Sequence, residues 1–128
     1  GAKYINLEHL GIQGGSSRGY FRCIDLLDSA SYNTIQHCKI KHIDNQRYSS
    51  SAGVSSSSYS YWYYGRKLNC FNLINNNNIN GFRTGIEFRG FDTDYRPIGN
   101  NIKDNLISNS ESLAINIEKQ RQMGTNPC

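Results

Sequence analysis

The sequence has no apolar run long enough to cross a bilayer and no dense basic cluster. A membrane-spanning helix needs about 20 consecutive apolar residues, and none of the 128 residues begins such a run, so we expect no membrane span. The 14 Lys and Arg residues are scattered despite a formal net charge of +4, which argues against nucleic acid as a partner. The N-terminus lacks Met and a signal-peptide pattern. It is therefore either processed or cut from a longer protein, and we expect the second.

The cysteines lack the spacing of a zinc site. They are Cys23, Cys38, Cys70 and Cys128. None forms a CxxC pair, so we expect no metal and no cofactor. Two disulfides can form in a secreted protein, but the spacing does not assign their pairing.

The composition excludes a disordered chain and disfavours long helices. Hydrophobic residues make up 37% and charged residues 19%, unlike the apolar-poor, charge-rich signature of disorder. The 12 glycines, nine tyrosines and many serines and asparagines favour short strands and turns, because Asn and Ser side chains compete for backbone hydrogen bonds. The length fits one domain, residues 1–128.

A repeat runs through the chain. Residues 33–41, 72–80 and 100–108 follow N-x-I-x-x-[C/N]-x-I-x, and residues 5–13 fit with Ile5 in place of the leading Asn. The starts lie 28, 39 and 28 residues apart, and we assign the extra length to a Ser/Tyr-rich loop insertion at about 46–61. A second apolar element recurs between copies, at residues 23–26, 85–88 and 114–117, with its degenerate counterpart expected near 62–65.

The spacing within each copy predicts two short strands joined by a bend. The two aliphatic positions are five residues apart, an odd offset that would put them on opposite faces of one straight strand. Asn adopts the left-handed conformation readily and can turn the corner. Repeated coils then form a parallel solenoid in which equivalent asparagines make an amide ladder. Two rival interpretations are disordered low complexity and an antiparallel sandwich, although only Asn80-Gly81 resembles a hairpin turn.

These copies resemble the right-handed parallel β-helix of the pectin-lyase-like superfamily, especially the repeats of bacterial carbohydrate-binding and sugar-hydrolysing surface proteins. The resemblance covers residues 4–118 apart from the serine-rich insertion, and it implies an all-β solenoid of about four to five coils, as a fragment of a longer one. It also implies an exported protein, extracellular or on the bacterial cell surface, that contacts carbohydrate or mediates adhesion. The alternatives are a polysaccharide lyase or glycoside hydrolase acting on an acidic glycan, and a purely structural part of a larger assembly.

In this family the substrate groove runs along the sheet built from the second element. Alternation directs Asp25, Glu87 and Asn116 outward in one row, with Tyr64 in the long coil. Asp25 and Glu87 would lie two interstrand steps apart, roughly 9 to 10 Å, near the upper end for an inverting glycosidase pair. The catalytic motifs of polygalacturonases are absent, so enzyme activity stays open.

Other candidate residues are aromatic or basic. Arg66 and Arg89 are suited to bind the carboxylates of an acidic sugar. Trp62 and Tyr64 can form a platform for sugar rings or pack beneath the long loop. His9 and His37 occupy equivalent places in successive copies and should stack, without a third metal ligand. Further coils or another chain are expected at the ends of the solenoid, because uncovered sheet edges invite pairing.

Overall fold

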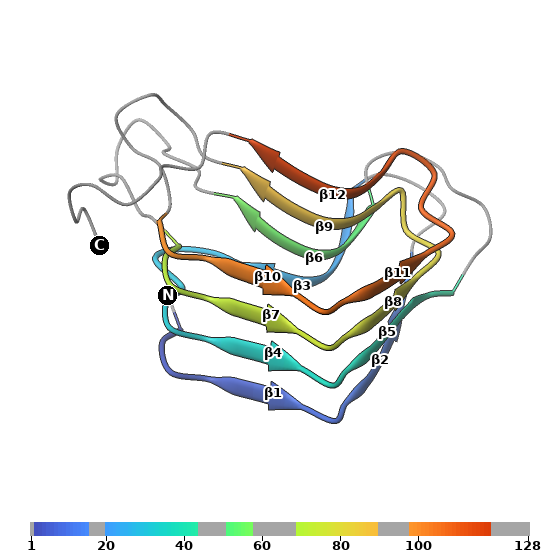
Figure 1. Ribbon diagram of the computed structural model, residues 1–128. Helices are drawn as coiled ribbons and strands as arrows, with labels where there is room; N and C mark the ends of the chain where they lie inside the picture. The colour runs from blue at the N-terminus through green and yellow to red at the C-terminus, as the bar shows by residue number, and fades with distance from the viewer. Residues whose placement is uncertain (1, 16–19, 44–50, 58–68, 90–97, 119–128) are drawn as a thin grey trace.

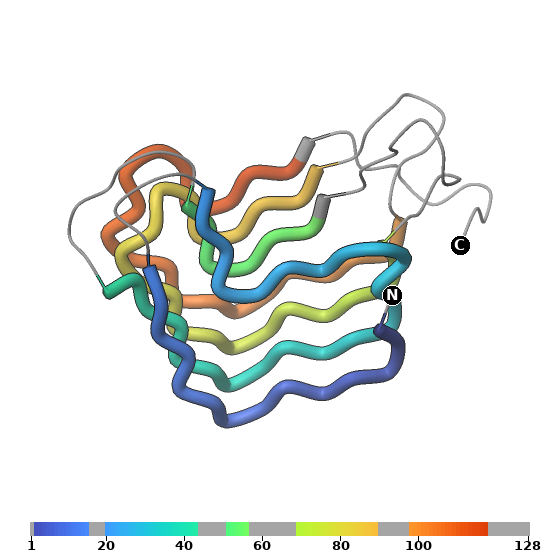
Figure 2. Tube along the Cα trace, turned by 180° about the vertical axis from the view of Figure 1, so that it is seen from behind, coloured from blue at the N-terminus to red at the C-terminus, as the bar shows by residue number. Residues whose placement is uncertain are grey.

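The chain winds into a right-handed parallel β-helix of about four coils, as expected (Figures 1 and 2). The computed structural model describes residues 2–15, 20–43, 51–57, 69–89 and 98–118, and these residues form three parallel sheets. We number the coils from the N-terminus. The ends of the solenoid are called the first-coil end and the last-coil end.

Each coil contributes one strand to each sheet. The first sheet contains β1 (Asn6–Glu8), β4 (Thr34–Gln36), β7 (Leu73–Asn75) and β10 (Asn101–Lys103). The second contains β2 (Gly11–Gly14), β5 (Lys39–His42), β8 (Asn78–Asn80) and β11 (Leu106–Ser108). The third contains β3 (Phe21–Leu26), β6 (Ser51–Ser57), β9 (Thr84–Arg89) and β12 (Leu113–Glu118). Each strand therefore pairs with strands of the neighbouring coils.

The repeated aliphatic residues stack in columns inside the solenoid. One column runs through Leu7, Ile35, Ile74 and Ile102, and another through Ile12, Ile40, Ile79 and Ile107. In the two inner coils these isoleucines are 0% exposed. Full burial of such a side chain contributes about 1.5–3 kcal/mol. The bend between the two aliphatic positions is what allows both to face the core, as the spacing predicted.

At this bend, one residue has the left-handed backbone conformation and the next residue supplies the amide of the ladder. We expected the ladder asparagine to turn the corner, but the positive φ angle belongs to the residue before it, which is Asn76 (51°) in the third coil. Asn77 instead directs its amide along the stack. Its Oδ1 accepts a hydrogen bond from the Cys38 backbone N–H at 2.9 Å, and its Nδ2 donates to the Ile35 carbonyl at 2.9 Å. The two tasks need different backbone conformations, so consecutive residues divide them.

A second amide ladder runs along the corner that precedes the first sheet. Asn72 Oδ1 accepts from the Asn33 backbone N–H, and Asn100 Oδ1 accepts from the Asn72 backbone N–H, each at 3.0 Å. In the first coil, the Ile5 backbone N–H donates to Asn33 Oδ1 at 3.0 Å. Both ladders satisfy backbone groups that the corners remove from the sheets.

Rings stack beside both corners. Tyr4, Tyr32 and Phe71 form a column with centroids 5.2 and 5.1 Å apart. The predicted stacking of His9 on His37 is confirmed, with centroids 5.1 Å apart. These residues all have positive φ angles, so the side chain of each left-handed residue lies over that of the next coil.

The third strand of the second coil is β6, which corrects the sequence-based register. Residues 51–57 were assigned to a loop insertion, with the strand expected near 62–65. β6 pairs directly with β3 and β9, while 62–65 lie outside the described residues. Small side chains fit here because the core is tight: a Cβ on Gly53 would lie 2.5 Å from Ile79 Cγ2. Tertiary packing therefore overrode the turn preference of serine.

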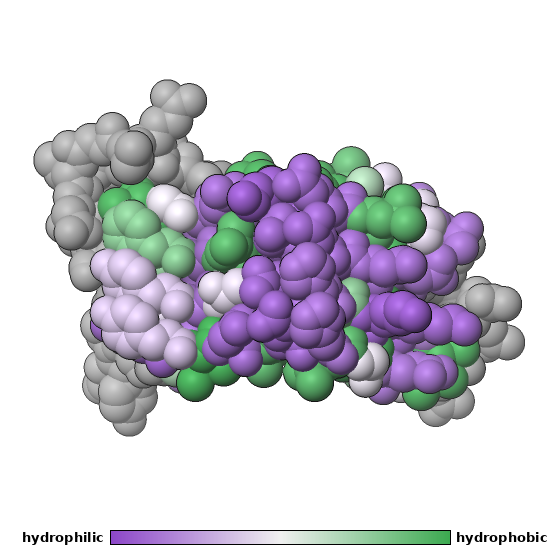
Figure 3. All heavy atoms as spheres, turned by 60° about the horizontal axis from the view of Figure 1, so that its bottom comes forward, coloured by the Kyte–Doolittle hydropathy of each residue, from purple (hydrophilic) through white to green (hydrophobic). Residues whose placement is uncertain are grey.

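The face seen in Figure 3 is polar over its middle, whereas the last-coil end is partly apolar. Figure 3 shows the molecule with the bottom of Figure 1 turned toward the viewer, and hydrophilic side chains cover the middle of this face. At the last-coil end, Ile115 and Ile117 are 43% and 54% exposed, although the equivalent Ile86 and Phe88 one coil below are at most 1% exposed. The last coil therefore leaves part of the core uncovered by the described residues.

Candidate functional site

The outer face of the third sheet carries a row of polar residues. Strand register aligns Asp25 with Ser55 and Ser55 with Glu87. Glu87 in turn aligns with Asn116 on the last strand. The predicted alignment of Asp25, Glu87 and Asn116 is present, and Ser55 occupies the place expected for Tyr64. Their functional roles remain predictions.

Glu87 binds two arginines. Arg22 Nη2 donates to Glu87 Oε2 and Arg89 Nη2 lies against Glu87 Oε1, both at 2.8 Å. Arg22 belongs to β3 and Glu87 to β9, so the Arg22 side chain crosses the intervening strand β6. The crossing is possible because β6 offers small side chains there, Ala52 and Ser55, which are 0% and 2% exposed. Both oxygens of Glu87 are therefore engaged by guanidinium groups.

A surface hollow of about 250 Å³ surrounds this cluster. Its lining residues are Arg22, Ser51, Arg83, Thr84, Glu87, Arg89, Ser112, Leu113 and Asn116. The lining has three arginines against one carboxylate, which is already bound by two of them. Arg83 makes no ion pair among the described residues, and its backbone N–H is fixed by Ser51 Oγ at 2.9 Å. The hollow thus has an excess of positive charge, suited to an anionic ligand.

Arg22 is also held from its other side. Its guanidinium carbon lies 5.6 Å from the ring centroid of Tyr20, within cation–π range. Glu87 and Tyr20 together restrain the Arg22 side chain across the sheet. A restrained guanidinium loses less side-chain entropy when it binds a ligand.

Asp25 belongs to a different hollow. The Ser55 hydroxyl donates to Asp25 Oδ1. Asp25 borders a hollow of about 270 Å³ at the first-coil end, lined largely by apolar side chains including Ile5, Leu7 and Ile24. Ser55 separates Asp25 from Glu87, so two interstrand steps of about 4.8 Å lie between the carboxylates. The structure does not bring the two carboxylates together in one hollow.

The remaining predicted residues divide into two groups. Arg89 and Asn116 line the arginine hollow, whereas Trp62, Tyr64 and Arg66 lie outside the described residues. Sequence reasoning missed Arg22 and Arg83. Arg22 lies next to the apolar element at residues 23–26. Its contact with Glu87 depends on the position of β6, and that strand was expected near residues 62–65. Arg22 directly precedes the apolar element at residues 23–26 and Arg83 lies two residues before the one at 85–88, but no arginine stands at the corresponding place before 114–117, so no periodicity marks the two arginines.

The His and Cys residues offer no metal cluster in the described ranges. No group of three or more His, Cys, Asp or Glu side chains there is placed to hold an ion. Burial raises the pKa of the Cys23 thiol to about 11, which disfavours the reactive thiolate at neutral pH. Cys23 and Cys38 are free, and Cys70 is disulfide-bonded.

Comparisons of the chain with protein-family models, curated proteins and solved structures gave no match. Within the described segments, no helix has the length and hydrophobicity needed to cross a membrane. The functional argument therefore depends on the geometry of the arginine hollow.

Proposed function

We propose that the chain is an exported β-helical scaffold that contacts an acidic carbohydrate through the arginine hollow of the third sheet. The observation that carries the proposal is the convergence of Arg22, Arg83 and Arg89 around one buried carboxylate. Guanidinium groups bind carboxylates and sulfates through paired, charge-assisted hydrogen bonds. Glu87 holds two arginines in place, and Arg83 is the cation most available to an incoming anion.

The shape of the site favours part of a polymer over a small enclosed ligand. The hollow of about 250 Å³ falls below the range of roughly 300–1,000 Å³ that is usual for drug-sized ligands. One acidic sugar unit can occupy it while the rest of the chain lies along the sheet. The polar groups of Ser51, Ser112 and Asn116 supply hydrogen-bonding partners for sugar hydroxyls.

Two further observations support the proposed location outside the cell and the proposed superfamily. The disulfide at Cys70 is typical of oxidising compartments, consistent with an extracellular or cell-surface location. The three-sheet coil with a bend between its first two strands supports membership of the pectin-lyase-like superfamily.

The test measures binding of polygalacturonate to wild type, Arg83→Ala and Lys41→Ala. Methyl-esterified polygalacturonate is the matched neutral ligand. Lys41 is an exposed cation on β5, so Lys41→Ala changes net charge equally at a different sheet. Loss of one charge-assisted contact predicts that Arg83→Ala weakens binding about tenfold or more, whereas Lys41→Ala changes it less than about twofold.

Four results would argue against the proposal. Equal losses in both variants would indicate nonspecific attraction, and equal affinity for the esterified ligand would remove the role of the carboxylates. Release of reducing ends or unsaturated uronates would replace binding by the alternative activity, a polysaccharide lyase or glycoside hydrolase. No binding to any acidic glycan would favour the purely structural role.

A further inference from the structure

The cysteines of the described ranges comprise two free thiols and one disulfide-bonded residue. Cys23 and Cys38 are free, whereas Cys70 is disulfide-bonded. The fourth cysteine, Cys128, lies outside the described residues. Because the sequence contains four cysteines in all, elimination leaves Cys128 as the partner of Cys70 within one chain.

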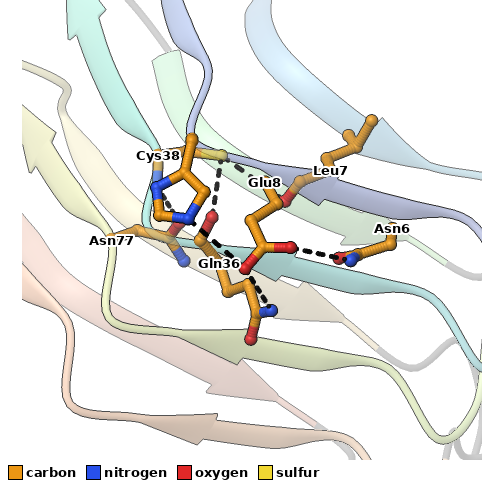
Figure 4. Close-up of polar contacts among 7 residues, drawn as sticks. Asn6, Leu7, Glu8, Gln36, Cys38 and Asn77 are labelled. Carbon is orange, nitrogen blue, oxygen red and sulfur yellow. Dashed lines mark hydrogen bonds and ion pairs between the residues drawn. The ribbon is translucent and has the colours of Figure 1, made fainter.

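The two free thiols are placed where they do not readily enter a disulfide. Cys38 is 1% exposed, and its thiol donates to the Leu7 and Gln36 carbonyls at 3.5 and 3.2 Å (Figure 4). Burial raises the pKa of the Cys23 thiol to about 11, so this thiol stays protonated at neutral pH, and only a thiolate attacks a disulfide. Exchange with either thiol in the folded protein should therefore not redirect the bond of Cys70.

Cys70 is fixed at the corner that precedes β7, between the second and the fourth coils. Its backbone N–H donates to Ser31 Oγ at 3.1 Å, and its carbonyl accepts from the Tyr32 N–H at 3.0 Å. Its side chain is 0% exposed and packs with Ile98 and Phe71. A residue bonded to Cys70 is therefore attached to the inner part of the solenoid.

The path of the preceding coil shows that the segment after β12 is long enough to reach Cys70. Glu118, the last residue of β12, aligns with Arg89 at the end of β9. Nine residues after Arg89, the chain arrives at Ile98, which packs against Cys70. Cys128 follows Glu118 by ten residues, which span up to about 33–36 Å when extended. In Figure 1, β9 and β12 end on the side of the solenoid where β7 and β10 begin.

The last coil is the part of the solenoid that gains most from such a bond. Among the described strands, β12 pairs with β9 alone. Its side chains Leu113, Ile115 and Ile117 are 47%, 43% and 54% exposed. A terminal repeat has an interface on one side, so it opens more readily than an inner repeat. A cross-link from Cys70 to Cys128 opposes this opening, because it restricts the conformations of the opened chain.

We propose that Cys70 pairs with Cys128, that this disulfide fastens the last coil to the third, and that it thereby controls the arginine hollow. Ser112, Leu113 and Asn116 form the side of the hollow at β12, so opening of the last coil removes that side. Reduction adds two electrons and two protons, which a dithiol supplies by thiol–disulfide exchange while it is itself oxidised to a disulfide. The hollow is then complete in the oxidised protein and incomplete in the reduced one. The control of ligand binding rests on the proposed function, whereas the pairing and the fastening do not.

A peptide map tests the pairing. Trypsin leaves Cys23 and Cys38 together in residues 23–39, Cys70 in 68–83 and Cys128 in 122–128. The free thiols of the monomeric protein are alkylated in denaturant without reductant, and mass spectrometry should then find 68–83 linked to 122–128. The peptide 23–39 should carry two alkyl groups. A link from 68–83 to 23–39, or an alkylated Cys70, would overturn the pairing.

Hydrogen exchange tests the fastening. In Cys128→Ser, or in wild type reduced with dithiothreitol, the amides of β12 should exchange at least about tenfold faster, as expected for loss of a disulfide that closes a long loop. The amides of β4 should keep their rates. Met123→Ser is the matched control, because it alters the same segment and keeps both cysteines. Unchanged exchange in β12, or equal acceleration in β4, would overturn a role specific to the last coil.

Binding of polygalacturonate separates this inference from the proposed function. Wild type should bind at least about tenfold more tightly than Cys128→Ser, because opening of β12 removes several polar contacts. Equal binding by the two proteins would overturn the control of the hollow by the disulfide. Failure of wild type to bind would overturn the proposed function and this control together, while the peptide map and the exchange rates still decide the pairing and the fastening.

Discussion

Replacing Asn77 by Ala should destabilise the protein strongly, because this side chain joins three coils. Asn77 is 1% exposed. Its removal leaves the Cys38 N–H and the Ile35 carbonyl without the partners that they have at 2.9 Å. An unsatisfied buried polar group costs about 1–3 kcal/mol, so leaving two such groups unsatisfied should lower the free energy of unfolding by about 2–6 kcal/mol. Urea unfolding followed by circular dichroism, with the disulfide intact, measures the free energy of unfolding.

Asn75→Ala is the matched control in the same coil. Asn75 is also buried at 9% exposure, but its Oδ1 has no hydrogen-bond partner. Removing it should cost less than about 1 kcal/mol, since it orphans no backbone group. Equal losses in the two variants would refute the ladder as the source of stability and would point to side-chain volume instead.

Two further substitutions test neighbouring parts of the packing. Cys38→Asn should stabilise the protein by about 0.5–1.5 kcal/mol in urea unfolding, because the new amide can accept a hydrogen bond from the Leu10 N–H and donate one to the Leu7 carbonyl. Unchanged or lower stability would contradict this expectation. Gly53→Ala should destabilise it by about 1–3 kcal/mol, since the new Cβ would lie 2.5 Å from an Ile79 methyl group. Gly11→Ala is the control, because nothing lies within 4 Å of its added Cβ, and its melting temperature should be close to that of wild type. Similar melting temperatures for the two alanine variants would show that β6 can move to accommodate the Cβ at residue 53.

The regular coils were predictable because their signals are local. The five-residue offset between Ile35 and Ile40 requires a bend, and its recurrence at Ile74 and Ile79 fixes the register between coils. The order of the residues also predicted the stacking of His9 on His37. In a solenoid each coil contacts only its neighbours, so a short pattern carries most of the fold.

The second coil was less predictable because its third strand lacks the apolar pattern. Residues 51–57 are mainly serine with Ala, Gly and Val, a composition that favours turns. They form β6 because the β3 and β9 edges supply hydrogen-bonding partners on both sides. The same small residues let Arg22 cross to Glu87. Because residues 51–57 were assigned to a loop, the contact between Arg22 and Glu87 at the centre of the candidate site was not predicted either.

The sequence by itself determined the coil, its bend and the presence of amide ladders, since the repeat carries both the aliphatic spacing and the asparagines. The direction of the ladders joins neighbouring coils and was decided by the structure. Only the tertiary structure decided which charged side chains meet. Arg22 and Glu87 are 65 residues apart and in contact at 2.8 Å, and no repeat position links them. Their contact arises from a side chain that spans two strand spacings over small residues, a property of the assembled sheet and of no single segment.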